Sequence, residues 1–280
     1  YRVKAYELPE GGRDAKGQHV ANQLAFRPGE TIAQVMAITT YDDAEYLVLA
    51  TRDGLVKKTA LSAYNSPRSA GVIAINLRED EDGNSDELVS ARIANSDDDL
   101  MLVTRKGMSL RFEASDEALR PTGRTTSGVR GIKLRSGDEL LTMEVVVDDA
   151  DFVVVTEGGY AKRTPLSEYR VQGRGGLGIK VANVREDRGA LVGALVTSGD
   201  EELLAISEGG KIVRVNVSDV RPTGRTTAGV ILARPDEDDR LIAVTRNTES
   251  QVDDEAPQVE SDQAVEDQGD TVSGEENADD

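Results

Sequence analysis

The chain has 280 residues, 38% of them hydrophobic, so it is long enough to bury a sizeable core. It contains no cysteine, which excludes disulfides, zinc–thiolate sites and thiol chemistry. No stretch approaches the length of uninterrupted apolar sequence that a membrane-spanning helix needs, and we expect a cytoplasmic protein. The formal net charge of −19 argues against a nucleic-acid partner.

The distribution of the charge reverses that last argument. Residues 247–280 hold 13 of the 52 acidic residues and no Lys or Arg, which leaves 39 acidic against 33 basic residues in residues 1–246, a net charge of −6. The polar composition of residues 247–280 predicts a disordered acidic tail, and residues 1–246 are the expected folded domain. Within that domain the basic residues recur at fixed positions.

A repeat of about 50 residues organises the domain. Each unit has an apolar run, a turn glycine, a basic residue four positions later, a loop arginine, and a second glycine that opens a new apolar run. The turn glycines are Gly54, Gly107, Gly159 and Gly210, the basic residues Lys58, Arg111, Arg163 and Arg214, the loop arginines Arg68, Arg124, Arg174 and Arg225, and the second glycines Gly71, Gly128, Gly178 and Gly229. The same frame fits Arg2, Arg13 and Gly17, so five units are visible, and we expect at least one more before Tyr1.

Each unit has the pattern of short strands separated by Gly, Asp and Asn turns. The second unit predicts strands at residues 32–39, 46–50, 56–59 and 72–77. Glycine-containing hairpin turns are expected at residues 52–54 and 208–210. Residues 115–119 and 166–169 suggest a single helical turn each. This pattern predicts an all-β fold, a propeller-like ring of small four-stranded sheets.

One glycine-rich loop, residues 173–178, fits the G-x-G-x-x-G pattern of dinucleotide-binding folds. Those folds require a helix directly after the glycines, so that its N-terminus faces a pyrophosphate. Residues 179–184 instead alternate as in a β-strand. The context therefore argues against a dinucleotide site.

Four stretches carry a family resemblance: YLVLATRDGLVKKT, DEALRPTGRTTSGVRGIKL, GGYAKRTPLSEYRVQGRGGLG and RPTGRTTAGV. They resemble the C-terminal domain of the A protein of bacterial DNA gyrase, over residues 1–246. The resemblance implies a six-bladed β-pinwheel whose blades exchange strands and whose outer rim wraps duplex DNA. Five of those blades would be visible here.

The same resemblance implies a role in a type II topoisomerase, in which an A2B2 enzyme introduces negative supercoils with ATP. The implied partners are duplex DNA, the gyrase B protein and the N-terminal breakage-reunion domain of the gyrase A protein, and the implied location is the nucleoid. ATP and Mg²⁺ would belong to the holoenzyme, and no cofactor, metal or catalytic residue is expected in this chain. Two alternatives stay open: the C-terminal domain of the A-type protein of the decatenating topoisomerase IV, and a non-catalytic propeller scaffold for protein partners.

The family's signature box has a Gln, two basic residues, Gly-Gly, a basic residue and Gly in the first blade, which the resemblance leads us to expect before Tyr1. A box-like copy remains at Gln172, Gly173, Arg174, Gly175, Gly176, Leu177 and Gly178. It departs from the box at Gly173 and Leu177, where basic residues would stand.

A DNA-wrapping rim must neutralise phosphates at intervals without reading bases. The candidate DNA-binding residues are Arg13, Arg68, Arg124, Arg174, Arg225, Lys58, Arg111, Lys162, Arg163, Arg214 and Lys180. Arginine can contact a phosphate in a bidentate manner, and neighbouring glycine amides can add to such a site. Two other interpretations remain: the loop arginines can hold their loops through carbonyls, and the basic residues after the turn glycines can protect strand edges.

Overall fold

The computed structural model describes residues 1–11 and 16–247. Arg13 and residues 248–280 of the predicted acidic tail lie outside the described residues. The compact unit that contains the sheets runs from Tyr1 to Asn247. The described residues contain β-strands and 3-10 turns but no α-helix, and none of their elements is long and apolar enough to cross a membrane.

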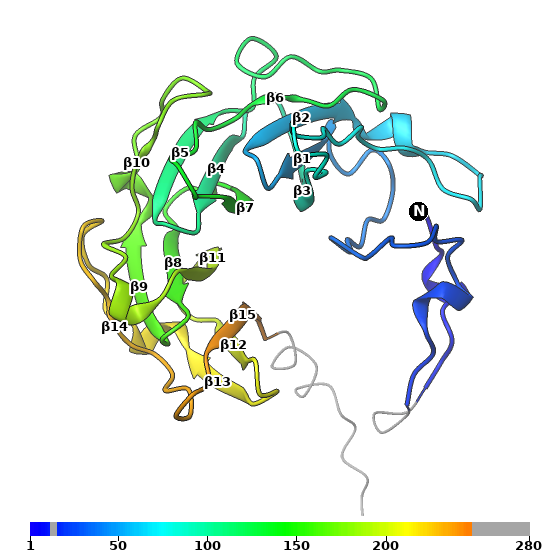
Figure 1. Cartoon of the computed structure of the whole chain (residues 1–280). Helices are drawn as coiled ribbons and strands as arrows, with labels where there is room; N and C mark the ends of the chain where they lie inside the picture. Colours follow the sequence, from blue (N-terminus) through cyan, green and yellow to red (C-terminus); the bar gives the residue numbers. More distant parts are fainter. Residues whose placement is uncertain (12–15, 248–280) are drawn as a thin grey trace, which may run out of the picture. The chain divides into compact units, whose positions relative to one another are not determined.

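The strands form four antiparallel sheets that stand side by side along an arc (Figure 1). The strands are β1 (Tyr46–Thr51), β2 (Leu55–Ala60), β3 (Leu88–Ala94), β4 (Asp99–Thr104), β5 (Met108–Glu113), β6 (Val129–Arg130), β7 (Leu140–Val145), β8 (Asp151–Thr156), β9 (Tyr160–Pro165), β10 (Ile179–Lys180), β11 (Leu191–Thr197), β12 (Glu202–Ser207), β13 (Ile212–Asn216), β14 (Val230–Ile231) and β15 (Leu241–Arg246). The 3-10 turns are η1 (Ala5–Glu7), η2 (Val20–Asn22), η3 (Leu61–Tyr64), η4 (Leu166–Glu168), η5 (Glu186–Arg188) and η6 (Val217–Asp219). The predicted all-β, propeller-like class is confirmed.

Each of three units gives one short strand to the unit before it. The sheet orders are β3-β1-β2-β6, β10-β5-β4-β7, β11-β8-β9-β14 and β13-β12-β15. The strands β6, β10 and β14, here called the donated strands, therefore pair with the return strand of the preceding hairpin. They lie on the outer side of the arc, and β3, β7, β11 and β15 lie on the inner side (Figure 1).

Apolar cores between successive sheets hold the arc together. Alternate residues of one strand face opposite neighbours: Leu100 and Leu102 of β4 pack with the first sheet, whereas Met101 and Val103 pack with the third. Both faces of the strand are buried, which explains why the predicted runs are apolar throughout rather than alternating.

Two expected strands, residues 32–39 and 72–77, are absent from the described chain. Residues 72–77 occupy the repeat position of the donated strands, and the described part of the first unit has only the 3-10 turns η1 and η2. Residues 72–77 make other backbone contacts instead: the Asn76 amide donates to the Thr126 carbonyl at 3.1 Å, and the Ala74 carbonyl accepts a hydrogen bond from Lys57 Nζ. The strand expected at residues 179–184 is only β10, because the chain crosses to the neighbouring sheet within two paired residues.

The expected turns are present. Gly54 and Gly210 have positive φ at the β1–β2 and β12–β13 hairpins, as their position in a tight turn requires. The helical turn expected near residue 166 is η4, and residues 115–119 form one turn closed by the Leu119 amide and the Ser115 carbonyl at 2.8 Å.

Candidate nucleic-acid interface

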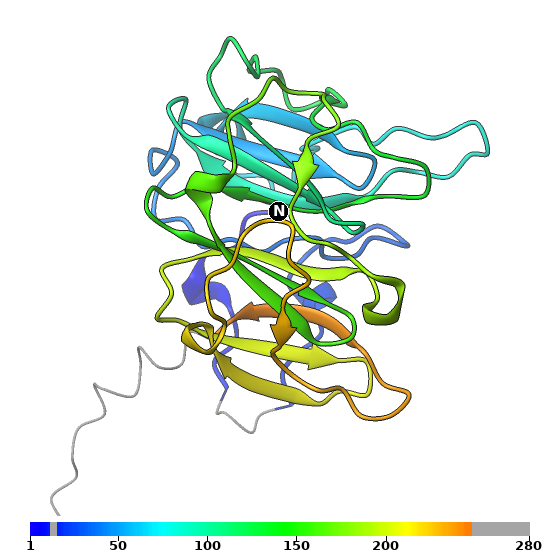
Figure 2. The ribbon, with the colours of Figure 1, turned by 90° about the vertical axis from the view of Figure 1, so that its left-hand side faces the viewer.

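The loops that precede the donated strands lie on the outer side of the sheets. Figure 2 views this side, with β10 and β14 and their preceding loops in front of the sheets. We call residues 121–127, 172–177 and 222–228 the rim loops. Near the start of each, Thr122, Gln172 and Thr223 donate an amide hydrogen bond of 2.8 Å to a carbonyl of the preceding return strand. The three rim loops therefore start from equivalent anchors, and Arg124, Arg174 and Arg225 occupy one repeat position.

Arg174 is exposed in its rim loop and reaches back to the preceding unit. Its Nε donates to the Ala118 carbonyl at 3.0 Å and its Nη1 to the Arg130 carbonyl at 2.6 Å. Arg225 repeats the second contact, since its Nη1 donates to the Lys180 carbonyl at 3.3 Å. These two arginines therefore hold their loops, as the carbonyl interpretation expects. A guanidinium has five donors, so these contacts leave donors for a phosphate.

The donated strands add a second exposed cation beside the rim arginines. Arg130 of β6 and Lys180 of β10 hold the same position after Gly128 and Gly178, and both side chains are exposed. Lys180 is among the predicted residues, and Arg130 is not. The repeat frame that pointed to Lys180 could have found Arg130, because both stand two positions after the second glycine.

Some backbone groups of the box-like loop already form hydrogen bonds with other segments of the domain. The Gln172 amide donates to the Arg111 carbonyl, and the Gly175 amide donates to the Gly131 carbonyl at 2.7 Å. The Gly176 carbonyl accepts from the Lys133 amide at 2.8 Å. The expectation that neighbouring amides approach a phosphate is wrong for Gly175, because its amide already has a backbone partner. The loop thus offers an anion the Arg174 side chain but not the Gly175 amide.

Arg68 and Arg124 complete the loop arginines that the structure describes. Arg68 is exposed and its amide donates to Ser66 Oγ at 3.4 Å. Arg124 is half-buried, and its carbonyl accepts a hydrogen bond from Lys57 Nζ.

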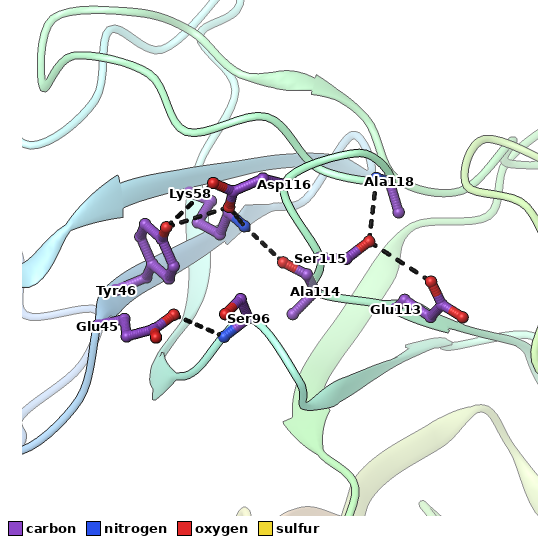
Figure 3. A network of polar contacts seen from close by, with 9 residues as sticks. All are labelled: Glu45, Tyr46, Lys58, Ser96, Glu113, Ala114, Ser115, Asp116 and Ala118. Carbon is purple, nitrogen blue, oxygen red and sulfur yellow. Dashed lines mark hydrogen bonds and ion pairs between the residues drawn. The ribbon is translucent and has the colours of Figure 1, made fainter.

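Lys58 is not at the surface. Its side chain is fully buried, and Nζ lies 2.6 Å from Asp116 Oδ1, donates to the Ala114 carbonyl, and sits 4.2 Å from the Tyr46 ring centroid (Figure 3). The prediction that Lys58 contacts DNA is wrong, because its charge is enclosed by the next unit. The edge-protection alternative is wrong for the same reason.

Arg111 and Arg163 have the same role in later units. Arg111 pairs with Asp99 at 2.7 Å and donates weakly to the Leu166 carbonyl, and Arg163 pairs with Asp151 at 3.2 Å and donates to the Val217 carbonyl. Ala114, Leu166 and Val217 are equivalent positions, seven residues after a turn glycine. The basic residue therefore recurs because it ties one unit to the next, and the prediction of a DNA contact is corrected.

The last member, Arg214, is more exposed and lies 3.6 Å from Glu202. Lys162 is a further correction: its side chain is 2% exposed, and Nζ donates to the carbonyls of Val181, Gly224 and Arg225. Lys57, which the sequence did not single out, is 1% exposed and makes equivalent contacts. Of the predicted residues within the described chain, Arg68, Arg124, Arg174, Arg225 and Lys180 remain candidates on or beside the rim loops, and the prediction for Arg214 is not contradicted.

Comparison with known proteins agrees with this architecture. The family model described as "DNA gyrase C-terminal domain, beta-propeller" matches residues 1–39, 45–95, 98–146, 150–198 and 201–247, which correspond to the five sequence units. The DNA gyrase A protein of Streptomyces coelicolor is 57% identical over 95% of the chain, and that of Mycolicibacterium smegmatis is 55% identical over 89%. The chain spans only 31% and 29% of those relatives, about a third of their length.

Two solved structures share the fold. The structure of a DNA gyrase A C-terminal domain aligns with a TM-score of 0.75 and 28% identity, covering 88% of this chain and 78% of that one. The crystal structure of a C-terminal domain of DNA topoisomerase IV aligns with a TM-score of 0.74 and 27% identity, covering 82% and 70%. The fold alone does not separate the two enzymes, whereas the family model and the more identical relatives do. The chain belongs to the DNA gyrase C-terminal domain family.

Proposed function

We propose that the outer side of this domain binds the phosphate backbone of duplex DNA and wraps the duplex along the arc of sheets. One observation carries the proposal: equivalent arginines recur in successive rim loops, and two of them contact the backbone of a donated-strand residue that has an exposed cationic side chain. Arg174 contacts the backbone of Arg130, and Arg225 contacts that of Lys180. The phosphates of duplex DNA repeat at regular intervals, and a protein can contact them without reading the bases. Cations at the same position of each unit match such a partner.

The arrangement also meets an energetic requirement. Smooth bending of a short duplex costs about 1 to 6 kcal/mol, so wrapping needs a series of contacts rather than one strong site. The arc of sheets supplies such a series, and hydrogen bonds from Lys58, Arg111 and Arg163 connect successive units.

The intact protein would be a gyrase A protein with this chain as its C-terminal domain. That protein would be part of a type II topoisomerase that introduces negative supercoils. The gyrase B protein, the N-terminal breakage-reunion domain of the gyrase A protein, and ATP with Mg²⁺ would supply the assembly and the chemistry, in a cytoplasmic complex associated with the nucleoid. The identity of the named relatives supports this assignment.

The test is duplex binding by the chain and by the double variant Arg174→Ala/Arg225→Ala. Each guanidinium lost removes a charge-assisted contact, so we expect at least about tenfold weaker binding at low salt. The control is Arg240→Ala, which removes an exposed arginine paired with Glu208 away from the rim loops. Equal losses in the two variants, or no binding by the unaltered chain, would contradict the proposal and favour a protein-binding scaffold.

A further inference from the structure

Two buried lysines lie beneath two of the three rim loops. Lys57 of β2 and Lys162 of β9 each stand three positions after a turn glycine, and their side chains are 1% and 2% exposed. Neither forms an ion pair within the described residues. A buried ammonium group without a carboxylate is unusual, because removing its charge from water is costly.

The two lysines bind the rim loops through backbone carbonyls. Lys57 Nζ donates to the carbonyls of Arg124 and Ala74. Lys162 Nζ donates to those of Arg225 and Val181, and to the Gly224 carbonyl at 3.3 Å. In both units the ammonium group is therefore bonded to the residue whose side chain is the proposed phosphate contact.

The third rim loop provides an internal comparison. Residues 121–126 and 222–227 have the same sequence, Pro-Thr-Gly-Arg-Thr-Thr, and each rests on a lysine. Residues 172–177 have a different sequence, and the residue beneath them is Leu110. A Cβ placed on Gly176 would lie 3.6 Å from Leu110 Cδ1, so this loop rests on an apolar contact instead. Within this chain, the lysine accompanies one loop sequence and is missing from the other.

We propose that Lys57 and Lys162 are positioning residues for DNA binding, whose ammonium groups hold the loops of Arg124 and Arg225 and whose charge is compensated by phosphate when DNA binds. This inference rests on the proposed function of the rim. It assigns the two lysines a role in binding although neither touches the solvent-exposed surface that a duplex can reach.

The electrostatics of the two lysines support a link between their protonation and phosphate binding at the rim. Burial and, to a smaller extent, the Arg124 guanidinium lower the pKa of Lys57 to about 8. The pKa of Lys162 is also lowered to about 8, mainly by burial; the Glu168 carboxylate opposes this shift and the Arg225 guanidinium adds to it. A phosphate placed on the rim arginines would favour the charged form of each lysine and raise its pKa. DNA binding should then take up protons at mildly alkaline pH.

Other groups near the lysines do not titrate in this range. Tyr64 shares the Ala74 carbonyl with Lys57, and burial raises its pKa. Burial also raises the pKa of Tyr169, which lies near Arg225 and Glu168. The two lysines are therefore the groups expected to change charge at these loops.

Stability and binding should respond to pH in opposite directions. The pKa of each lysine is lower in the folded chain than the value of about 10.4 expected when unfolded, so between about pH 8 and pH 10.4 the unfolded chain binds more protons. The contribution of these lysines to the free energy of unfolding therefore rises with pH. DNA affinity should fall over the same range, because the charge-assisted bonds to the loop carbonyls weaken. If the lysines had only a structural role, stability would still rise with pH, but DNA affinity would not fall.

The experiment compares the unaltered chain with Lys57→Met/Lys162→Met in duplex titrations at pH 7 and pH 9, at constant ionic strength. Methionine keeps the length of the side chain and removes its charge. We expect the affinity of the unaltered chain to fall about tenfold from pH 7 to pH 9, and that of the double variant to be weaker at pH 7 and nearly independent of pH. The matched control is Leu110→Met, at the equivalent position of the third loop, which should behave like the unaltered chain.

A second measurement needs no variant: calorimetric titration at pH 8.5 in two buffers of different ionisation enthalpy should show proton uptake on DNA binding. DNA binding with no proton uptake, or an unchanged pH profile in the double variant, would overturn the role of the lysines and leave the proposed function standing. Failure of the unaltered chain to bind duplex DNA at pH 7 would overturn the proposed function itself.

Discussion

Gly178 lies directly against the backbone of Ser109: a Cβ at position 178 would stand 2.1 Å from the Ser109 carbonyl oxygen. The same close approach recurs at the other donated strands. A Cβ at position 128 would lie 2.7 Å from the Val56 carbonyl oxygen, and a Cβ at position 229 would lie 2.4 Å from the Ala161 carbonyl oxygen. All three glycines have positive φ. The second glycine of each unit therefore marks the point at which the chain enters the neighbouring sheet.

We expect Gly178→Ala to lower the free energy of unfolding by about 2 kcal/mol or more, because alanine would adopt a left-handed conformation and meet a carbonyl. Gly173→Ala is the matched control in the same loop, since its Cβ would meet no atom within 4 Å and its φ is not positive. Chemical denaturation of both variants measures the difference. Equal stabilities would show that the donated strand does not require glycine at its entry.

Arg111→Ala should destabilise the domain by about 1 to 3 kcal/mol, because it leaves the largely buried Asp99 without its ion pair. Binding of duplex DNA by the folded variant should change little. Thermal unfolding and duplex titration on the same preparation separate the two effects. A large loss of DNA affinity with an unchanged melting temperature would restore Arg111 to the rim.

The sequence predicted the repeat, the hairpins and the fold class because each depends on local patterns: apolar runs, turn glycines and their spacing. It did not predict which basic side chains lie at the surface and which are buried. Lys58 and Lys162 lie within recurring basic pairs that look like a surface stripe, yet both are buried by a neighbouring unit. Which side of a return strand faces that unit depends on strand exchange, and strand exchange is not visible in the spacing of residues.

The salt dependence of binding should reflect the reduced set of rim cations. Each neutralised phosphate contributes about −0.9 to the slope of log affinity against log salt. We expect Arg174→Ala to make this slope shallower by about one, and Arg163→Ala to leave it unchanged in the folded variant. Titrations of one duplex at three salt concentrations give the slopes. The same slope in Arg174→Ala as in the unaltered chain would exclude Arg174 as a phosphate contact.

Residues 248–280 should compete with DNA, because they carry 13 acidic residues and no Lys or Arg. Covalent attachment gives a tethered segment an effective concentration that can reach roughly mM. We expect truncation after Asn247 to tighten duplex binding at low salt, and the difference to fade near physiological salt, where the Debye length is about 8 Å. Equal affinities of the intact and truncated chains at low salt would leave these residues without a role in binding.

The rim should bend DNA along the arc rather than merely bind it, and this is the property that wrapping requires. A nicked circular plasmid, ligated in the presence of the chain and then freed of protein, records any wrap as a change in linking number. We expect a shift that grows with protein concentration, is absent with Arg174→Ala/Arg225→Ala, and is retained with Arg240→Ala. Binding of the plasmid by the unaltered chain without any change in linking number would contradict wrapping.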